Sequence, residues 1–587
     1  MKSIPLTVFL LSVVFWLSGT TLYFFNRDVF VLTAIISFYF SWMVWIGFGS
    51  KSFQLKFQNK ILSRFPYLFL IALSALVISN WFRTPLLIYV IFSALAIVFG
   101  LGSLRAMKYE KDLDESSELK EKNFSLFVMF LFCLILGVYL YLNIHNSTID
   151  SDEIRLLFDA KLITQGIVPF KEFNARAPVL IYLMAFLYHF WGIKIVYYRI
   201  FTAIIAWGSS VFLYLISKRF FSQRKALLVS LIYAALPVTL NFLYIKTETF
   251  SVFLGLLSVL LFILSRESIK NNYLRYISHL AMLLALLVRP TAILFYIFHF
   301  AIVTHSLNKE KWKNELKRLC FEVFSTVSVF LVSTLIFFRS HNSLLYTNTF
   351  KDFNVDYYSF SRFLLTPYYI SLTIIICSSI MLLDLFQNQL RNKSKLLIAM
   401  TLMLITLSII YIINTFLLGF WPQYYMDFAV PFAILAAYGI IYIPKVSDKS
   451  KFVSVALTII IFISFLQSYK PLYEYFHRIN LSLSYLQQTS KVIDSNTNNG
   501  AIIFSGNPEF ALISNRKQFL NLSHSYYDPK TVEFVTQKIN QQKPSLIIVD
   551  DYINRYYLEN SSFQNLLSSC YQQIDYSNVY KLSSLCR

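Results

Sequence analysis

The sequence predicts a polytopic α-helical membrane protein that ends in a small α/β domain outside the membrane. Of its 587 residues, 57% are hydrophobic and 14% are charged, and the mean hydropathy is +0.57. A water-soluble chain could not bury that much apolar surface. Apolar runs of about 18 to 22 residues recur, and this length matches the hydrocarbon thickness of a bilayer. After Lys470 the pattern changes to short β-type runs and an amphipathic helix.

The formal net charge of +21 does not indicate a nucleic-acid partner, because of where the charge lies. Residues 470–587 hold 11 Lys and Arg against 9 Asp and Glu, so most of the excess belongs to short loops between apolar runs. The positive-inside rule produces this pattern, because basic loops remain cytoplasmic. We therefore expect membrane lipid, and no nucleic acid, among the partners.

Alternation of apolar runs and basic loops predicts about 15 membrane crossings, with a cytoplasmic N-terminus and an extracytoplasmic C-terminal domain. The first run is too long for a removable signal peptide and has no small-residue cleavage site. For these sides to be correct, residues 179–190 cannot be a separate crossing. They must lie along the membrane interface or form one broken unit with the next span. The expected spans are 5–25, 29–49, 66–82, 85–104, 124–142, 196–216, 225–242, 247–264, 276–289, 291–304, 319–338, 363–385, 395–418, 427–443 and 452–468.

Three regions follow from this topology. Residues 1–123 are four extra N-terminal spans and a charged cytoplasmic loop, for which the sequence indicates no chemistry. Residues 124–469 form the membrane core, which includes the outer loop 143–178. Residues 470–587 form the extracytoplasmic α/β domain. We expect an integral membrane protein, in a bacterial inner (plasma) membrane.

The α/β domain is predicted from two short β-type runs, 501–504 and 546–549, with an amphipathic helix at 530–541 between them. Its two cysteines, Cys570 and Cys586, could form a disulfide if the compartment is oxidising. The sequence leaves open whether they pair.

The outer loop carries the candidate chemistry. It holds five acids: Asp150, Asp152, Glu153, Asp159 and Glu172. Carboxylates near a membrane surface are costly, so they indicate a functional site, although an ordinary polar loop between two spans is the alternative. Just past a helix exit, the Asp152–Glu153 pair can present a carboxylate as a general base, and partial shielding from water would raise its pKa.

An anionic substrate would need a cation near this base. Arg176 provides one, with a fork geometry that suits phosphate. A base and a phosphate-binding arginine beside lipid indicate group transfer from a lipid-linked phosphate.

Several short motifs occur in one order along residues 124–445. They are Asp152-Glu153, Gln165-Gly166 with the segment VPFKEF at 168–173, RAPVLIY at 176–182, Thr247-Glu248-Thr249, Arg289-Pro290-Thr291, and WPQYY at 421–425 followed by Pro431. Together they resemble the GT-C membrane glycosyltransferases, in the branch of protein O-mannosyltransferases and lipid A aminoarabinose transferases. This resemblance implies that residues 124–469 are a GT-C-like catalytic core.

The resemblance also implies an activity: an inverting transfer of a sugar from a polyprenyl-phosphate donor to an acceptor hydroxyl at the outer membrane face. Asp152, with Glu153 beside it, would be the catalytic base, and Arg176 falls where the family has its donor-phosphate lysine. The other implied site residues are Arg289 as a second phosphate ligand, Glu248 as an acceptor or sugar contact, and Gln423 and Tyr424 at the donor site. The acceptor (a glycan, a lipid or a protein) and the donor sugar stay open.

Simpler roles stand beside these assignments. Arg289 could only extend to the lipid headgroups, Glu248 could only cap its helix, and Tyr424 could belong to an interfacial aromatic belt. The sequence also departs from the family pattern. Arg176-Ala177 replaces Lys-Pro, Glu248 stands where Asp is common, and Gln423 stands where His is common. These departures affect donor specificity more than the base.

Metal use is a separate question. Asp150 and Asp152 form a D-x-D pair, which in other transferases binds a divalent cation. The W-W-D-Y-G signature of the metal-dependent oligosaccharyltransferases in this superfamily is absent. We therefore expect no obligatory metal or other cofactor, with Asp150 and Asp152 as the ligands if a divalent cation is used.

The alternative function is a transporter or flippase of a lipid-linked glycan. Such a protein would carry ionisable residues within its spans and an internal repeat of broken helices. The sequence shows no such repeat, and its candidate charges cluster at the outer ends of the spans.

Overall fold

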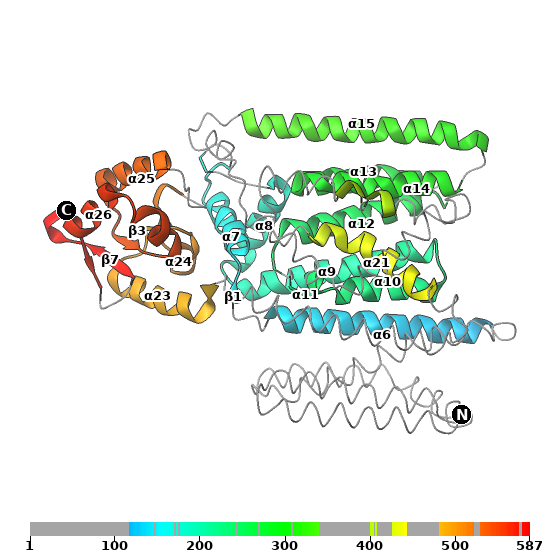
Figure 1. The fold of residues 1–587 in the computed structure, drawn as a ribbon, viewed down its shortest axis with the longest axis horizontal. Coiled ribbons are helices and arrows are strands. Elements are labelled where there is room, and N and C mark those ends of the chain that lie inside the picture. Colours follow the sequence, from blue (N-terminus) through cyan, green and yellow to red (C-terminus); the bar gives the residue numbers. More distant parts are fainter. Residues whose placement is uncertain are drawn as a thin grey trace, which may run out of the picture. The chain divides into compact units, whose positions relative to one another are not determined.

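The computed structural model of the chain consists of two compact units (Figure 1). The first comprises Met1–Tyr141 with Phe221–Leu228, and the second comprises Leu142–Phe220 with Val229–Arg587. The two units are defined by their internal contacts and not by membrane topology. The three regions expected from the topology therefore remain a prediction. The structure describes residues 117–144, 148–169, 172–173, 177–241, 244–267, 271–306, 309–339, 400–403, 405–407, 425–442, 481–521, 529–574 and 578–586.

Helix α6 (Ser117–Ile144) contains the expected span 124–142. Its segment Phe127–Ile144 is one of three in the described part of the chain that are long and apolar enough to cross a membrane. The number of about 15 spans stays a prediction, because many of them lie outside the described residues. Those are 5–25, 29–49, 66–82, 85–104, 363–385, 452–468 and most of 395–418.

The other two such helices, α9 (Ile195–Lys218) and α12 (Thr247–Ser265), agree closely with the expected spans 196–216 and 247–264. Shorter helices accompany them. They are α8 (Pro178–Trp191), α10 (Gln223–Ala235), α11 (Pro237–Asn241), α13 (Asn272–Val288), the 3-10 turn η3 (Pro290–Phe295), α14 (Tyr296–Ser306) and α21 (Tyr425–Tyr442). Helix α15 (Lys309–Arg339) joins the basic segment and the expected span 319–338 in one helix.

One expected span is corrected. Its described residues, 225–241, belong to two helices, α10 and α11, which are separated at Leu236. Pro237 accounts for the break, because proline has no N–H to continue the helix and its ring clashes with the preceding turn.

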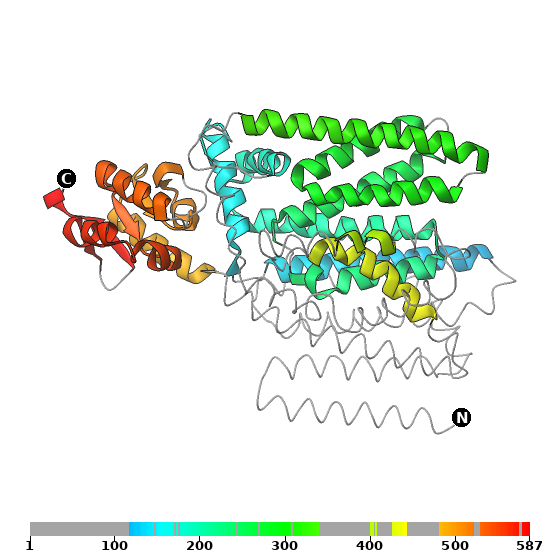
Figure 2. The ribbon, with the colours of Figure 1, turned by 45° about the horizontal axis from the view of Figure 1, so that its top comes forward.

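Helix α12 packs between α9 and α13 (Figures 1 and 2). Two glycines permit this close packing. A Cβ atom on Gly208 of α9 would lie 2.7 Å from the Phe253 ring, and one on Gly255 of α12 would lie 2.5 Å from the Phe295 ring. Small residues at such contacts let helices approach closely where the hydrophobic effect gives no net drive.

Ionisable side chains, of which Arg275 is buried, connect α13 to α15. Arg275 Nη1 contacts Glu315 Oε2 at 2.9 Å and Arg275 Nε contacts Glu322 Oε1 at 2.8 Å, while His279 Nε2 lies 3.1 Å from Glu322 Oε2. Their pairing follows the rule that charges within a bundle neutralise one another.

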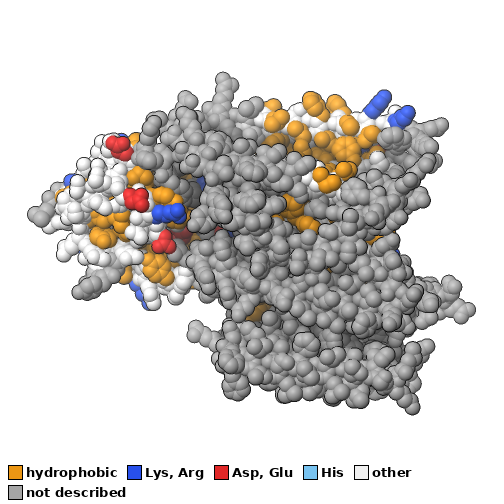
Figure 3. All heavy atoms as spheres, in the orientation of Figure 1, with side chains coloured by type: hydrophobic (Ala, Val, Ile, Leu, Met, Phe, Trp, Pro, Cys, Tyr) orange, Lys and Arg blue, Asp and Glu red, His pale blue; other side chains and the backbone are white. Residues whose placement is uncertain are grey.

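Helix α15 has a strongly apolar surface. Phe321 and Phe324 are each 70% exposed, and Leu331 and Val332 are also exposed. Figure 3 shows hydrophobic side chains gathered over this helix, with basic side chains at one end. An exposed apolar surface of this kind is typical of a face that contacts lipid or another apolar partner.

The C-terminal part of the second unit contains a five-stranded sheet in the order β4-β3-β5-β7-β6. β3 is parallel to β4 and β5, and β7 is antiparallel to β5 and β6. The strands are β3 (Ile502–Ser505), β4 (Lys517–Gln518), β5 (Leu546–Ile548), β6 (Tyr571–Gln573) and β7 (Val579–Leu582); the helices are α23 (Leu483–Asn496), α24 (Glu509–Ile513), α25 (Pro529–Gln542) and α26 (Ser561–Cys570). The expected runs 501–504 and 546–549 are thus β3 and β5, and the expected helix 530–541 is α25.

Residues alternate between the two faces of this sheet, as pleated strands require. Phe504 and Ile547 face a cluster formed with α25 and α26. Ile503 and Ile548 face a second cluster, which includes residues of α23, of α24 and of α7 (Ser151–Thr164). The sheet is therefore covered on both faces, and α7 contributes to one of them.

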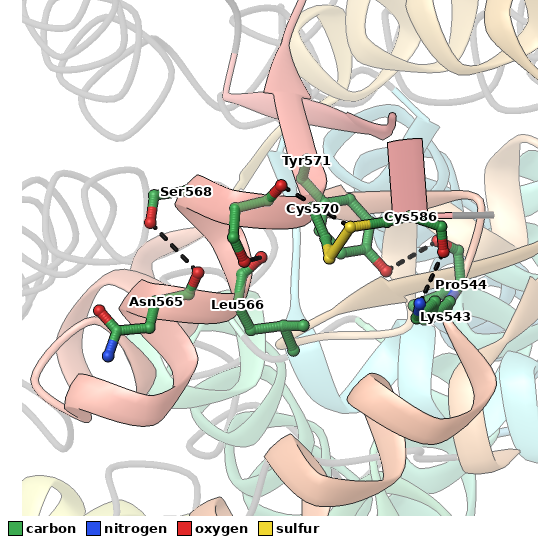
Figure 4. Close-up of a disulfide and its surroundings, with 9 residues drawn as sticks. Lys543, Pro544, Asn565, Leu566, Ser568, Cys570, Tyr571 and Cys586 are labelled. Atoms are coloured by element: carbon green, nitrogen blue, oxygen red, sulfur yellow. Dashed lines mark hydrogen bonds between the residues drawn. A yellow bond between two sulfur atoms is a disulfide. The ribbon is translucent and has the colours of Figure 1, made fainter. Parts of the chain in front are cut away.

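Cys570 and Cys586, whose pairing the sequence left open, form a disulfide with a Cα–Cα distance of 5.3 Å (Figure 4). Lys543 Nζ donates a hydrogen bond to the Cys586 carbonyl at 2.6 Å, and the Tyr571 hydroxyl donates to the Pro544 carbonyl at 3.0 Å. These bonds hold the end of the described chain against the sheet.

Candidate active site at the start of helix α7

Helix α7 and its N-cap carry four of the five acids of the outer loop, all except Glu172. The helix runs across the ends of α9, α12 and α13 (Figures 1 and 2). Asp150 is its N-cap, and Asp150 Oδ1 accepts a hydrogen bond from the Asp152 backbone N–H at 3.0 Å. This bond satisfies one of the N–H groups that a helix start leaves open. Asp152 and Glu153 lie in the first turn, where the helix dipole stabilises carboxylates.

These two neighbouring acids have opposite environments. The side chain of Asp152 is 45% exposed, whereas that of Glu153 is 0% exposed. Arg199 of α9 binds both oxygens of Glu153, with Nε–Oε1 at 3.2 Å and Nη2–Oε2 at 3.0 Å, and Nη2 also donates to the Thr148 carbonyl at 2.6 Å. Glu153 is therefore enclosed by protein, and Asp152 is the acid that a substrate can reach.

Lys246, which immediately precedes α12, connects the acids. Its Nζ lies 3.0 Å from Asp150 Oδ2 and 3.6 Å from Asp152 Oδ2. Burial disfavours the charged form of Lys246, but the carboxylates of Asp150, Asp152 and Glu248 outweigh burial and raise the pKa of Lys246. The ammonium thus remains charged, and it orients both aspartates.

This ammonium bears on the possible metal site. A cation bound by the D-x-D pair would lie between the Asp150 and Asp152 carboxylates, and Lys246 Nζ already contacts both of them. Among the residues that the structure describes, no group of three or more His, Cys, Asp or Glu could hold a metal ion. The residues present therefore do not fit a divalent cation unless Lys246 moves.

A second buried cluster lies near the start of α12. Arg289, at the end of α13, forms ion pairs with Glu248 and, at 3.4 Å, with Asp427 of α21. The Thr291 hydroxyl also donates to Asp427, at 3.1 Å. Glu248, Arg289 and Asp427 are all buried. Arg289 thus contacts carboxylates and does not extend to solvent as a headgroup contact would.

Three of the expected site residues, Arg176, Gln423 and Tyr424, lie outside the described residues. Their neighbours are described. Ala177 is the N-cap of α8, and Gln423 and Tyr424 directly precede α21, which brings Asp427 to Arg289. The start of α21 therefore lies at this cluster.

Ala177 has a left-handed backbone, with φ 49° and ψ 69°, and it precedes Pro178. The family pattern has proline at this position, and proline requires φ near −65°. We expect Ala177→Pro to destabilise the protein by more than about 1 kcal/mol, whereas Ala177→Gly should be neutral or slightly stabilising because glycine adopts positive φ readily. Thermal unfolding of both variants in one detergent checks this, and an Ala177→Pro protein as stable as the wild type would contradict it.

Sequence reasoning missed Lys246, Arg199 and Asp427. Each could have been found from its place in the sequence. Arg199 and Asp427 are charged residues inside apolar runs, where a charge is costly. Lys246 is a lysine at the outer end of a run, where the positive-inside rule does not expect one. Each such residue therefore needs a partner, and in this structure each has one.

Comparison with solved structures shows the class of fold. The chain is similar to the oligosaccharyltransferase of Archaeoglobus fulgidus in its apo form, with a TM-score of 0.52 and 11% identity over 77% of this chain and 72% of that one. A second structure is AglB of Archaeoglobus fulgidus in complex with an inhibitory peptide and a dolichol-phosphate. It has a TM-score of 0.48 and 10% identity, and the match covers 73% of this chain and 70% of that one. The fold of this chain is thus similar to that of the apo oligosaccharyltransferase.

Within this class, residues 175–338 match the family model described as dolichyl-phosphate-mannose-protein mannosyltransferase. This part of the chain is thus similar to that family, and the GT-C resemblance inferred from the motifs is confirmed. The matched segment contains Arg199, Lys246, Glu248 and Arg289 but begins after Asp152. A search of curated protein sequences found no match.

Proposed function

We propose that the protein is an inverting glycosyltransferase that moves a sugar from a polyprenyl-phosphate donor to an acceptor hydroxyl at the outer face of the membrane. A glycosyltransferase is supported in general by the mannosyltransferase family match. The proposed location is a bacterial inner membrane, with the N-terminus cytoplasmic and residues 470–587 outside. The acceptor is a glycan, a lipid or a protein.

The observation that carries the proposal is the half-exposed carboxylate of Asp152, between two buried acids at the N-terminus of α7. Asp152 would take the proton of the acceptor hydroxyl, whose oxygen attacks the anomeric carbon of the donor sugar. The bond from that carbon to the phosphate oxygen then breaks, and the polyprenyl phosphate leaves with the electron pair. Inversion follows from attack on the face opposite the leaving group.

We assign Glu153 a positioning role in place of the catalytic role expected from the sequence. Because both of its oxygens bind Arg199, Glu153 fixes the first turn of α7 relative to α9. Lys246 would orient Asp152, since its ammonium contacts that carboxylate.

The charge of the described site supports Arg176 as the donor-phosphate ligand. Lys246 pairs with Asp150 and Asp152, and Arg289 pairs with Glu248 and Asp427. A phosphate that approaches these four carboxylates would need a cation of its own nearby. Arg176 is such a cation, adjacent to the start of α8. Arg289 is proposed as a second ligand of the donor phosphate, provided that the donor displaces a carboxylate from it. Glu248 is proposed to contact the acceptor or the sugar, and Gln423 and Tyr424 to line the donor site.

The experiment is transfer from radiolabelled polyprenyl-phosphate hexoses and pentoses to membrane extract by the purified protein. We expect wild type to transfer one of these sugars. Arg176→Ala should raise the KM for the donor about tenfold or more, because it removes a charge-assisted hydrogen bond to phosphate. Lys218→Ala, at the end of α9 remote from α7, is the control. If a well-folded wild type consumes no donor across the panel, the transferase proposal is overturned.

The transporter alternative receives no support from the comparisons. The transferase proposal therefore depends on the family match and on Asp152.

A further inference from the structure

A cavity of about 520 Å³ lies between the second half of α7 and the C-terminal sheet. This volume is in the range of small-ligand sites. It is lined from α7 and the turn after it by Phe158, Lys161, Leu162, Gln165 and Ile167, and from β4 and its flanks by Arg516, Lys517, Gln518 and Asn521. None of the residues placed at the start of α7 lines it, so the cavity is distinct from the candidate active site.

The charged side chains that line this cavity are all positive. Lys161, Arg516 and Lys517 are cations, and no carboxylate is among the lining residues. Arg516 forms an ion pair with Asp494 at 3.0 Å. Its side-chain N–H groups also donate hydrogen bonds to Thr497, Asn499 and Ser514. Lys517 is exposed to solvent.

Lys161 is the most informative of the three. Its side chain is buried, and its Nζ donates to the carbonyls of Arg516 at 3.2 Å and Ala511 at 3.5 Å. No carboxylate of the described residues forms a salt bridge with it. Burial, together with the charge of Arg516, lowers the pKa of Lys161 to about 8. A buried ammonium that is paired only with carbonyls is costly, and an anion in the cavity would offset that cost.

The other polar lining residues are amides, which can donate to and accept from hydroxyl groups. Gln165 is exposed and Asn521 is half-buried, so both can reach a ligand, whereas Gln518 is already bonded to Ser505. Leu520 and Asn521 have positive φ values of 54° and 51°. Non-glycine residues in this strained region are frequent where a segment is shaped around a ligand.

Asp152 and the cavity residue Lys161 lie on the same helix, α7. Lys161 follows Asp152 by nine positions, which is about 14 Å along the helix axis at 1.5 Å per residue. A single sugar cannot reach both points, but a saccharide chain a few units long can.

We propose that this cavity binds an anionic sugar of the acceptor, one that bears a carboxylate or a phosphate, a few units away from the hydroxyl that Asp152 would activate. The inference rests on the proposed function, and it identifies the acceptor as an acidic glycan. Lys161 and Lys517 would bind the anionic group, and Gln165 and Asn521 would bind neighbouring hydroxyls.

Binding can be measured apart from transfer. The full chain in detergent is titrated with a glucuronic acid disaccharide, with glycerol 3-phosphate and with uncharged maltose, and each Kd is read by ligand-observed NMR. We expect both anions to bind, more weakly as salt is added, and maltose to bind at least fivefold more weakly. The first two probes distinguish a carboxylate from a phosphate.

Lys517 supplies the main variants, because an exposed side chain can change without unfolding the domain. Lys517→Gln should weaken binding of the anions up to about fivefold, and Lys517→Glu should weaken it further. Lys491→Gln, at an exposed lysine of α23 outside the cavity, removes the same charge and should leave Kd unchanged. Lys161→Met should weaken binding most, provided that circular dichroism shows the fold retained.

Equal effects of Lys517→Gln and Lys491→Gln, or no binding of either anion, would overturn the inference. The inference would also be overturned if neither anion bound but the protein bound vesicles of anionic phospholipid in a Lys517-dependent way. The surface around Lys517 would then contact a membrane. Asp152→Asn should leave these Kd values unchanged. Failed transfer with intact Lys517-dependent binding would therefore count against the proposed function, and normal transfer without such binding would count against the cavity alone.

Discussion

Asp152→Asn is expected to reduce sugar transfer about 10³-fold, with the loss in kcat and with donor binding retained. Asparagine has the shape of aspartate but cannot accept the proton of the acceptor hydroxyl, and a positioned general base contributes about 10²- to 10⁴-fold. The N-cap of α7 is unaffected, because the Asp150 side chain supplies it. The measurement is the initial rate of transfer from the radiolabelled donor at saturating concentration.

Two matched variants make this result specific. Asp551→Asn changes an exposed acid of the C-terminal domain and should leave the rate unchanged. Glu153→Gln keeps a hydrogen-bond acceptor for Arg199 but removes the charge, so its rate is measured per folded protein. Most of that rate should be retained, because we assign Glu153 a positioning role. Wild-type transfer by Asp152→Asn would show that the base is elsewhere. A loss in Glu153→Gln as large as in Asp152→Asn would refute the division of roles between the two acids.

The apolar spans were predictable because their signal is local. Helices α9 and α12 begin and end within two residues of the expected spans 196–216 and 247–264. A run of about twenty apolar residues satisfies its own backbone hydrogen bonds and needs no distant contact to define it. The prediction failed at 225–242 for a reason that was present in the sequence, since Pro237 interrupts the run.

The site was predictable only in part, because its ion pairs join residues that are far apart in sequence. The acids of α7 stand together in the sequence, but Glu153 meets Arg199 from α9, and Asp150 meets Lys246 from the start of α12. A single sequence shows that Arg199 is a costly residue within a span, yet not which carboxylate neutralises it. The same limit applies to the cavity, whose cations come from α7 and from residues 516–517.

Removal of the Glu153 carboxylate is expected to cause the largest loss of stability. Glu153→Ala leaves the Arg199 guanidinium, whose side chain is 3% exposed, without its carboxylate. Breaking a buried pair in this way costs about 3–5 kcal/mol, because the remaining charge stays out of water without compensation. We expect a lower midpoint of thermal unfolding in detergent. Faster hydrogen exchange of the α7 amides should accompany it, since the pair connects α7 to α9.

The exposed pair Arg219–Glu267 provides the control. Its atoms lie 2.6 Å apart, but its side chains are 46% and 40% exposed. Glu267→Ala should therefore cost no more than about 1 kcal/mol, because water already solvates both charges. The double variant Glu153→Met/Arg199→Met should recover much of the loss seen in Glu153→Ala, since it removes both buried charges together. Similar shifts for Glu153→Ala and Glu267→Ala would show that α7 is held by apolar packing, with little contribution from this pair.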